Sequence, residues 1–121
     1  MSRFSETVME HFSDPQNRGT LEDPDLIGAF GVAGQGPFFT LQLKLCDRRI
    51  EQARFECNAC GATVASGSVL TELVLGKTLN ECRCLTTDDL LQALDGLPAD
   101  KRYCAQIAIK ALQQAIQEPS V

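Results

Sequence analysis

The apolar pattern of this chain changes its period at Cys60, and this change restricts the folds that the chain can adopt. Residues 38–45 and 49–57 alternate between apolar and polar side chains, as strands with one buried face do. From Cys60 onward the spacing is that of a buried helix, and Gly76 stands where a C-terminal cap is expected. We therefore expect two antiparallel strands, tightly connected at 46–48, that lead directly into a long helix.

Shorter elements are expected on either side of this unit. Ser2 or Ser5 could cap a first helix that runs through Phe12, and residues 26–31 could form a short strand. Three further helices are expected at 79–84, at 87–94 and from Pro98 to about Gln117. The order of helix, strands and helices predicts an α+β fold, with the helices packed on one face of an antiparallel sheet.

Composition narrows the classes of function. The chain has 121 residues, which we interpret as a single domain over 1–121. Its net charge is −5 and it has no basic run, so neither a nucleic acid nor an anionic membrane is an expected partner. The N-terminus has no apolar signal core, and no apolar run of about 18 residues follows it. We expect a soluble, cytoplasmic protein.

Six cysteines in such a chain need an explanation. A domain of this size can build a core without cross-links, so metal chemistry, sulfur chemistry or simple burial are stronger interpretations than disulfides. Cys60 is the most informative, because it opens the long helix, where unpaired N–H groups and the helix dipole stabilise a thiolate. Gly61 beside it would let a ligand approach the backbone. The alternative for Cys60 is a buried structural cysteine.

The other cysteines carry weaker signals. Cys57 shares a strand face with apolar residues, so it is either a core filler or a chelating partner of Cys60, and a single C-x-x-C pair is a weak zinc signal. Cys46 lies at the far end of the strand pair, too distant to join a site at Cys60. Nothing local distinguishes Cys104. No role is assigned to the last two cysteines, of which Cys82 is expected to be packed and Cys84 to face solvent.

His11 is the only histidine, and a surface position on an amphipathic first helix is expected for it. No Ser/His/Asp set, phosphate-binding glycine motif or carboxylate pair stands out. The sequence gives no sign of a catalytic base, and we do not expect an enzyme.

Four segments together resemble one family, in order and along nearly the whole chain. The likeness to the IscU/NifU N-terminal-type iron–sulfur cluster assembly scaffold family is carried by FSETVMEHFSDPQNRG at 4–19, TLQLKL at 40–45, the cysteine–helix stretch 50–81 and YCAQIAIKALQQAI at 103–116. The resemblance implies a three-stranded antiparallel sheet with helices on one face, an IscU/SufE-like sandwich. It also implies assembly of a [2Fe–2S] cluster from iron and from sulfur delivered by a cysteine desulfurase, and transfer of that cluster to acceptor proteins.

The resemblance also places the site. In the family, three cysteines and an aspartate hold the cluster, and the two cysteines that open helices match Cys60 and Cys104. The loop cysteine falls at Gln35 and the aspartate at Pro37, on either side of Gly36. The chain therefore departs from the family pattern at two of the four ligand positions.

Two further departures lie near the last helix. Tyr103 stands where the family has a histidine before its third cysteine. LPADK at 97–101 replaces the leucine-proline-proline-valine-lysine segment that the family's dedicated chaperone reads. We do not expect that contact to be retained unchanged.

We hypothesise that Cys57, Cys60 and Cys104 form a rearranged three-thiolate site, open to a fourth ligand from Gln35, a partner or a small thiol. A homodimer that shares one cluster is a related arrangement. The alternative is a relative that binds the desulfurase, or accepts a persulfide on Cys60 or Cys104, without building a cluster. The third interpretation is a zinc-bound sulfur-transfer protein, for which zinc needs four N, O or S donors, and the fourth is a metal-free structural or regulatory subunit.

Overall fold

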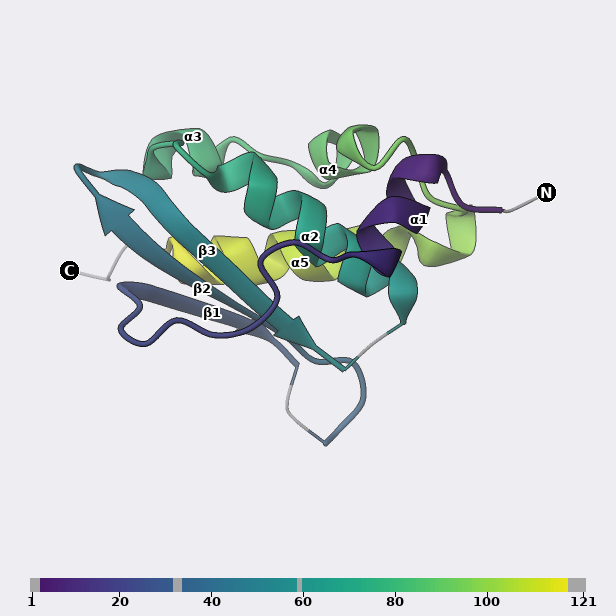
Figure 1. Cartoon of the computed structure of the whole chain (residues 1–121), viewed down its shortest axis with the longest axis horizontal. Helices are drawn as coiled ribbons and strands as arrows, with labels where there is room; N and C mark the ends of the chain where they lie inside the picture. The colour runs from purple at the N-terminus through teal and green to yellow at the C-terminus, as the bar shows by residue number, and fades with distance from the viewer. Residues whose placement is uncertain (1–2, 32–33, 59, 118–121) are drawn as a thin grey trace.

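The structure is a computed structural model that describes residues 3–31, 34–58 and 60–117. Figure 1 shows a sheet with helices gathered on one side of it. In chain order, the elements are α1 (Glu6–Ser13), β1 (Leu26–Phe30), β2 (Phe39–Cys46), β3 (Arg49–Cys57), α2 (Gly61–Val74), α3 (Leu79–Arg83), α4 (Thr87–Ala93), a 3-10 turn (Ala99–Lys101) and α5 (Arg102–Ala115). The α+β class expected from the sequence is confirmed.

The three strands form an antiparallel meander in the order β1-β2-β3. Phe39 at the start of β2 pairs with Phe30 at the end of β1 and with Cys57 at the end of β3. At the other end, Asp47 and Arg48 connect β2 to β3 with φ of 53° and 65°, the left-handed backbone that a two-residue hairpin turn requires. The β1–β2 loop and the β3–α2 connection therefore lie at the same end of the sheet (Figure 1).

Two long helices cover one face of the sheet. α2 packs on β3, and α5 packs on β1 and β2. The residues of the strands that point toward these helices, among them Leu41, Leu43 and Phe55, are fully buried. The rings of Phe39 and Phe55 stack with their centroids 5.6 Å apart. The alternate residues of β2 are only half-buried, so apolar burial on one face fixes the register of the strands.

Side-chain caps set the starts of α1, α3 and α4. The Ser5 hydroxyl accepts a hydrogen bond from the Val8 N–H at 3.1 Å and begins α1, whereas Ser2, the alternative cap, lies outside the described residues. Thr78 and Thr86 begin α3 and α4 with capping boxes.

The last helix starts later than the sequence predicts. Pro98 is followed by the 3-10 turn, and α5 begins only at Arg102. Lys101 between them has φ of −119° and ψ of 0°, which lies outside the α-helical region and interrupts the helix.

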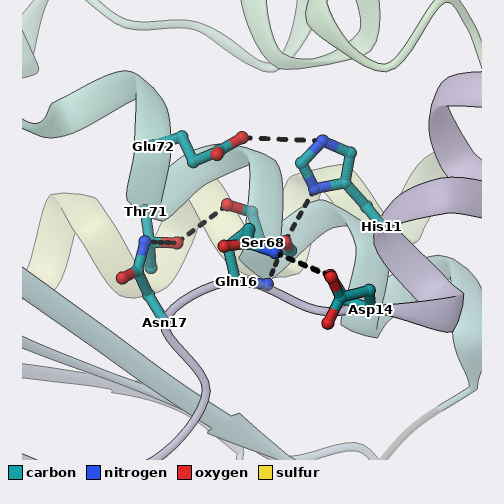
Figure 2. A network of polar contacts seen from close by, with 7 residues as sticks. All are labelled: His11, Asp14, Gln16, Asn17, Ser68, Thr71 and Glu72. Carbon is teal, nitrogen blue, oxygen red and sulfur yellow. Dashed lines mark hydrogen bonds and ion pairs between the residues drawn. The ribbon is translucent and has the colours of Figure 1, made fainter.

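The expectation of a surface position for His11 is wrong. Its Nδ1 lies 2.7 Å from the Ser68 hydroxyl, and its Nε2 lies 3.5 Å from a Glu72 carboxylate oxygen (Figure 2). The Gln16 N–H also donates to the Ser68 hydroxyl, at 2.7 Å. Ser68 is fully buried, so this network ties α1 and the loop after it to α2. The contact of α1 with α2 therefore combines this polar network with the apolar packing of Phe12 against Gly61.

All six cysteines lie within the described residues, and none of them forms a disulfide bond. Cys82 is buried and Cys84 exposed, as expected, and Cys46 is exposed at the hairpin end of the sheet. Among the described helices, none combines the length and the apolar character needed to cross a bilayer.

Candidate functional site

Two cysteines from different helices form a pair at one end of the molecule. Cys60 is the N-cap residue of α2, and Cys104 lies in the first turn of α5. Their Sγ atoms are 3.7 Å apart. Cys104 is fully buried, whereas Cys60 is exposed. The pair therefore has one sulfur in the core and one that a partner can reach.

The topology explains why cysteines 44 residues apart along the chain meet. α2 and α5 pack against each other on the same face of the sheet. Both helices begin at the same end of the molecule (Figure 1). The N-terminal end of a helix carries partial positive charge, so two helix starts converge on the two sulfurs.

Hydrogen bonds make Cys60 the more acidic thiol of the pair. Partial burial raises the pKa of Cys60, but hydrogen bonds from the N–H and the hydroxyl of Thr63 outweigh it. The N–H of Ala62 and the thiol of Cys104 lower the pKa further, and it falls to about 7. The hydroxyl oxygen of Thr63 lies 3.8 Å from the sulfur. A helix start lowers the pKa of a cysteine in this way in other proteins as well.

Cys104 behaves in the opposite way. Burial is the main cause that raises the pKa of its thiol, and the negative charge of a Cys60 thiolate raises it further. The first proton therefore leaves from Cys60. Above about pH 7 the pair consists mainly of an exposed thiolate and a buried thiol.

Two residues near the start of α5 flank the pair. Lys101 Nζ lies 3.9 Å from Cys60 Sγ and 6.0 Å from the ring centroid of Tyr103. Tyr103, at the position where the family resemblance implies a histidine, is 45% exposed. The pKa of the Tyr103 hydroxyl is raised, mainly by the negative charge of Cys104. The ammonium group of Lys101 favours an anionic sulfur species at Cys60.

A groove of about 410 Å³ opens beside Cys60, between α1 and the start of α2. Gly61 was expected to admit a ligand to the backbone, but the ring of Phe12 occupies that place. A Cβ at residue 61 would lie 2.8 Å from Phe12 Cδ1, so this glycine allows α1 to pack close to the cysteine pair. The walls of the groove are mainly apolar, from Phe4, Val8, Met9, Phe12 and Ala62, with Lys101 at its edge.

The distance between the two sulfurs is that of two thiolates on one metal ion. With metal–sulfur bonds of about 2.3 Å and tetrahedral angles, two such thiolates lie about 3.8 Å apart, and the observed separation is 3.7 Å. The pair thus fits half of the coordination sphere of a tetrahedral ion. A [2Fe–2S] cluster held by cysteines alone needs four thiolates, twice the number present here.

Cys57 does not complete the set. It is buried on the inner face of β3 and belongs to the hydrophobic core. Across the described parts of the chain, no three His, Cys, Asp or Glu side chains form a group that could hold a metal ion. The three-thiolate arrangement is therefore not preassembled, because strand alternation turns the Cys57 side chain into the core with that of Phe55. A role for Cys57 as a ligand stays a prediction that this geometry does not support.

The loop that replaces the family's ligand loop lies at the expected end of the sheet. Gln35, Gly36 and Pro37 are exposed between β1 and β2. Asn58, just after β3, fixes this loop: its Nδ2 donates to the Gly36 carbonyl at 3.4 Å, and its Oδ1 accepts the Phe38 N–H at 3.0 Å. The loop is thus held beside the connection to α2. Coordination of a metal by Gln35 stays a prediction.

Sequence reasoning missed Thr63 and Lys101. A signal for each exists in the spacing: Thr63 is the third residue after a helix-capping cysteine, and side chains at that position reach back to the cap. Lys101 precedes Cys104 by three residues, about one turn of a helix. Neither spacing is informative until it is known that the two helix starts meet.

Comparison with known sequences identifies relatives over nearly the full chain. The sequence pattern of the NifU-like N terminal domain matches residues 3–119. Iron-sulfur cluster assembly scaffold protein IscU 1 of Archaeoglobus fulgidus is 39% identical over 113 residues, which cover 93% of this chain and 74% of the relative. The scaffold protein IscU of Escherichia coli K12 is 35% identical over 119 residues, which cover 95% of this chain and 92% of the relative.

Solved structures with the same fold agree with this result. A candidate iron–sulfur cluster assembly scaffold of the SUF system from Fervidobacterium islandicum AW-1 superposes with a TM-score of 0.72 at 20% identity, over 94% of this chain and 96% of that one. The N-terminal part of a NifU-like protein from Brucella abortus superposes with a TM-score of 0.60 at 23% identity, over 91% and 76%. At these identities the likeness shows the three-stranded α+β fold. Together with the sequence matches, it leads to one conclusion: this chain belongs to the NifU-like N-terminal domain family.

Proposed function

We propose that the protein is an iron–sulfur cluster assembly scaffold that uses Cys60 and Cys104 as its cluster-binding thiolates. The observation that carries this proposal is the 3.7 Å distance between the two sulfurs, which is the spacing of two thiolates on one tetrahedral ion. Relatives at 35–39% identity bear the name of this scaffold. In this role the cluster is cargo, which the protein binds and transfers.

We propose that the Sγ atom of Cys60 receives the delivered sulfur. It is exposed, its pKa of about 7 provides a thiolate near neutral pH, and thiolates are the nucleophiles in sulfur transfer. The sulfur donor would be a cysteine desulfurase and the recipients of the finished cluster would be acceptor proteins, both in the cytoplasm. The apolar groove beside Cys60 offers a surface on which such a partner can place its reactive group next to the thiolate.

We further propose that two copies of the chain share one [2Fe–2S] cluster. Each iron of such a cluster takes two thiolates, and one Cys60–Cys104 pair supplies two. A second copy supplies the other two, which removes the need for the absent loop cysteine and aspartate. Gln35 and Cys57 are not ligands in this arrangement.

Anaerobic reconstitution with ferrous iron and sulfide tests the proposal. We expect the absorption spectrum of a [2Fe–2S] cluster, one cluster per two chains, and the mass of a dimer by native mass spectrometry. Cys60→Ser or Cys104→Ser should abolish the cluster, whereas Cys57→Ala, Gln35→Ala and the distant control Cys46→Ser should keep it. A cluster that forms on a single chain, or that depends on Cys57, would contradict the shared arrangement.

A second function is favoured by one specific observation, the presence of Gln35 and Pro37 at the positions of two family ligands. In this alternative, the protein accepts a persulfide on Cys60 and passes sulfur on without assembling a cluster. Persulfide formation on Cys60 without any cluster spectrum would support it. Elemental analysis of the protein purified without added metal separates both functions from a zinc-bound form, which would carry about one zinc per chain.

A further inference from the structure

We propose that Cys104 cleaves a persulfide carried by Cys60, so that the pair releases hydrosulfide and closes into a disulfide. This inference rests on the proposed function, in which sulfur arrives on Cys60. It adds a step that follows arrival: the site itself converts the delivered sulfur atom to the sulfide state that a cluster contains.

The separation of the two sulfurs allows this step. Cys60 Sγ and Cys104 Sγ are 3.7 Å apart and both are free thiols. A disulfide bond is about 2.05 Å long, so side-chain movement of less than 2 Å brings the sulfurs to bonding distance. The sulfur–sulfur distance of two thiolates on one metal ion and that of a disulfide differ by no more than this movement. The same pair can therefore bind a metal ion and also close into a disulfide.

The difference in exposure fixes the direction of the reaction. Cys104 is fully buried, so a sulfur donor cannot reach it, whereas Cys60 is exposed and lines the groove next to α1. The attached sulfur atom therefore extends toward the groove and solvent. Displacement at sulfur proceeds in line, with the leaving atom opposite to the attacking one. Attack from the buried side by Cys104 expels an atom on the open side.

The step balances in atoms and electrons. Cys104 attacks the Sγ of Cys60 as a thiolate, the Cys60 Sγ–Cys104 Sγ bond forms, and the bond from Cys60 Sγ to the outer sulfur breaks. The outer sulfur gains two electrons and leaves with the proton of Cys104 as hydrosulfide. The two cysteine sulfurs together lose those two electrons as they become a disulfide. No outside oxidant or reductant takes part in this step.

Lys101 is placed to assist the departure. Its ammonium nitrogen lies 3.9 Å from Cys60 Sγ, and a cation at this range stabilises both the persulfide anion and the hydrosulfide that leaves. The disulfide that results removes both thiolates from metal binding. A dithiol reductant is then required to reopen the pair before the next sulfur atom or a cluster can bind.

The test uses the full chain without metal, under anaerobic conditions and with a chelator. The reduced protein is treated with inorganic polysulfide, the excess is removed, and the products are read by intact mass, peptide mapping and sulfide assay. For the native chain we expect loss of two hydrogen atoms, a Cys60–Cys104 disulfide, and one hydrosulfide released per chain without added reductant. Treatment with sulfide alone should leave the thiols unchanged.

Variants separate this step from sulfur acceptance itself. Cys104→Ser should gain the mass of one sulfur atom on Cys60, retain it, and release no sulfide until a reductant is added. Because Cys104 lies in the core, Cys104→Ala is run in parallel, with far-UV circular dichroism to confirm folding. Cys46→Ser, at the other end of the sheet, should behave as the native chain does.

Two outcomes overturn the inference. If the native chain itself retains the added sulfur and releases none, Cys104 does not cleave the persulfide, and the proposed function stands without it. If neither the native chain nor Cys104→Ser takes up sulfur on Cys60, both this step and the acceptance of sulfur by Cys60 are wrong. The anaerobic reconstitution described above then tests separately whether the protein assembles a cluster.

Discussion

The ammonium nitrogen of Lys101 lies 3.9 Å from the sulfur of Cys60. The lysine ends the turn before α5, and the cysteine caps α2, so this contact joins the two helix starts that form the site. The same sulfur also accepts hydrogen bonds from the backbone of its own helix. Positive potential from two sources therefore converges on a single exposed thiol: the N–H groups at the positive end of the α2 dipole and the ammonium group of Lys101.

The first prediction concerns the pH dependence of this thiol. Because its pKa is about 7, the rate of alkylation of Cys60 by iodoacetamide should rise about tenfold per pH unit below that value and level off above pH 8. Site-resolved mass spectrometry gives an internal comparison, since Cys46 is also exposed and a hydrogen bond to Glu51 raises its pKa. Cys46 should still gain reactivity above pH 8. Equal profiles at the two sites would refute the assignment of Cys60 as the thiolate.

The second prediction isolates the lysine. Lys101→Met removes the ammonium group and keeps an apolar stem of similar length, so the pKa of Cys60 should rise. Alkylation of Cys60 at pH 7 should slow by about two- to fivefold, a modest change because an exposed charge pair is screened by solvent. Lys101→Arg should retain the rate. Lys110→Met, on α5 with its ammonium group over the Phe30 ring, is the control for the lost net charge. An equal slowing in this variant would contradict a local effect.

The fold could be predicted from the sequence because its elements follow local rules. The alternation of Phe39, Leu41 and Leu43 predicts a strand whose inner residues are indeed buried, and the helices expected near 79–84 and 87–94 begin directly after the caps Thr78 and Thr86. Each of these signals depends on side chains a few residues apart. Their physical cause, burial of one face or satisfaction of helix N–H groups, acts within a single element.

The site was less predictable because it depends on contacts between elements. Family resemblance assigned Cys60 and Cys104, but nothing local to Cys104 pointed to a role. The surface assignment of His11 was wrong because its partners, Ser68 and Glu72, lie on another helix. Gly61 was interpreted as an opening for a ligand, whereas Phe12 of α1 fills that space. Such errors arise where the packing of one helix against another decides what a residue touches.

The third prediction tests the network between α1 and α2. Ser68→Ala removes the hydroxyl that serves both His11 and the Gln16 N–H, and it should lower the free energy of unfolding by about 1–3 kcal/mol because buried polar groups lose their partner. Urea unfolding measures the change. Glu72→Gln is the matched control: this side chain is 50% exposed, so its substitution should cost less than about 1 kcal/mol. Similar losses of unfolding free energy in the two variants would show that the buried hydroxyl of Ser68 is not the main contributor to the network.

The last prediction concerns the packing of α5, which carries Cys104 to the site. A Cβ on Gly28 of β1 would lie 2.0 Å from the Ala111 carbonyl oxygen and 2.7 Å from the Ala115 backbone nitrogen of α5. Backbone cannot yield as a side chain can, so Gly28→Ala must push the helix away from the sheet. We expect a loss of at least about 1–3 kcal/mol in the free energy of unfolding, the usual cost of overpacking.

A matched substitution on the same strand separates this clash from a general effect on β1. Ile27 is 59% exposed, and Ile27→Thr keeps a β-branched side chain there, so unfolding in urea should change little. Because α5 also positions Cys104, Gly28→Ala should in addition weaken the Cys60–Cys104 pair, with less cluster retained after reconstitution than in Ile27→Thr. If Gly28→Ala lowers stability but leaves the cluster yield unchanged, the start of α5 is held at α2 independently of its packing on the sheet.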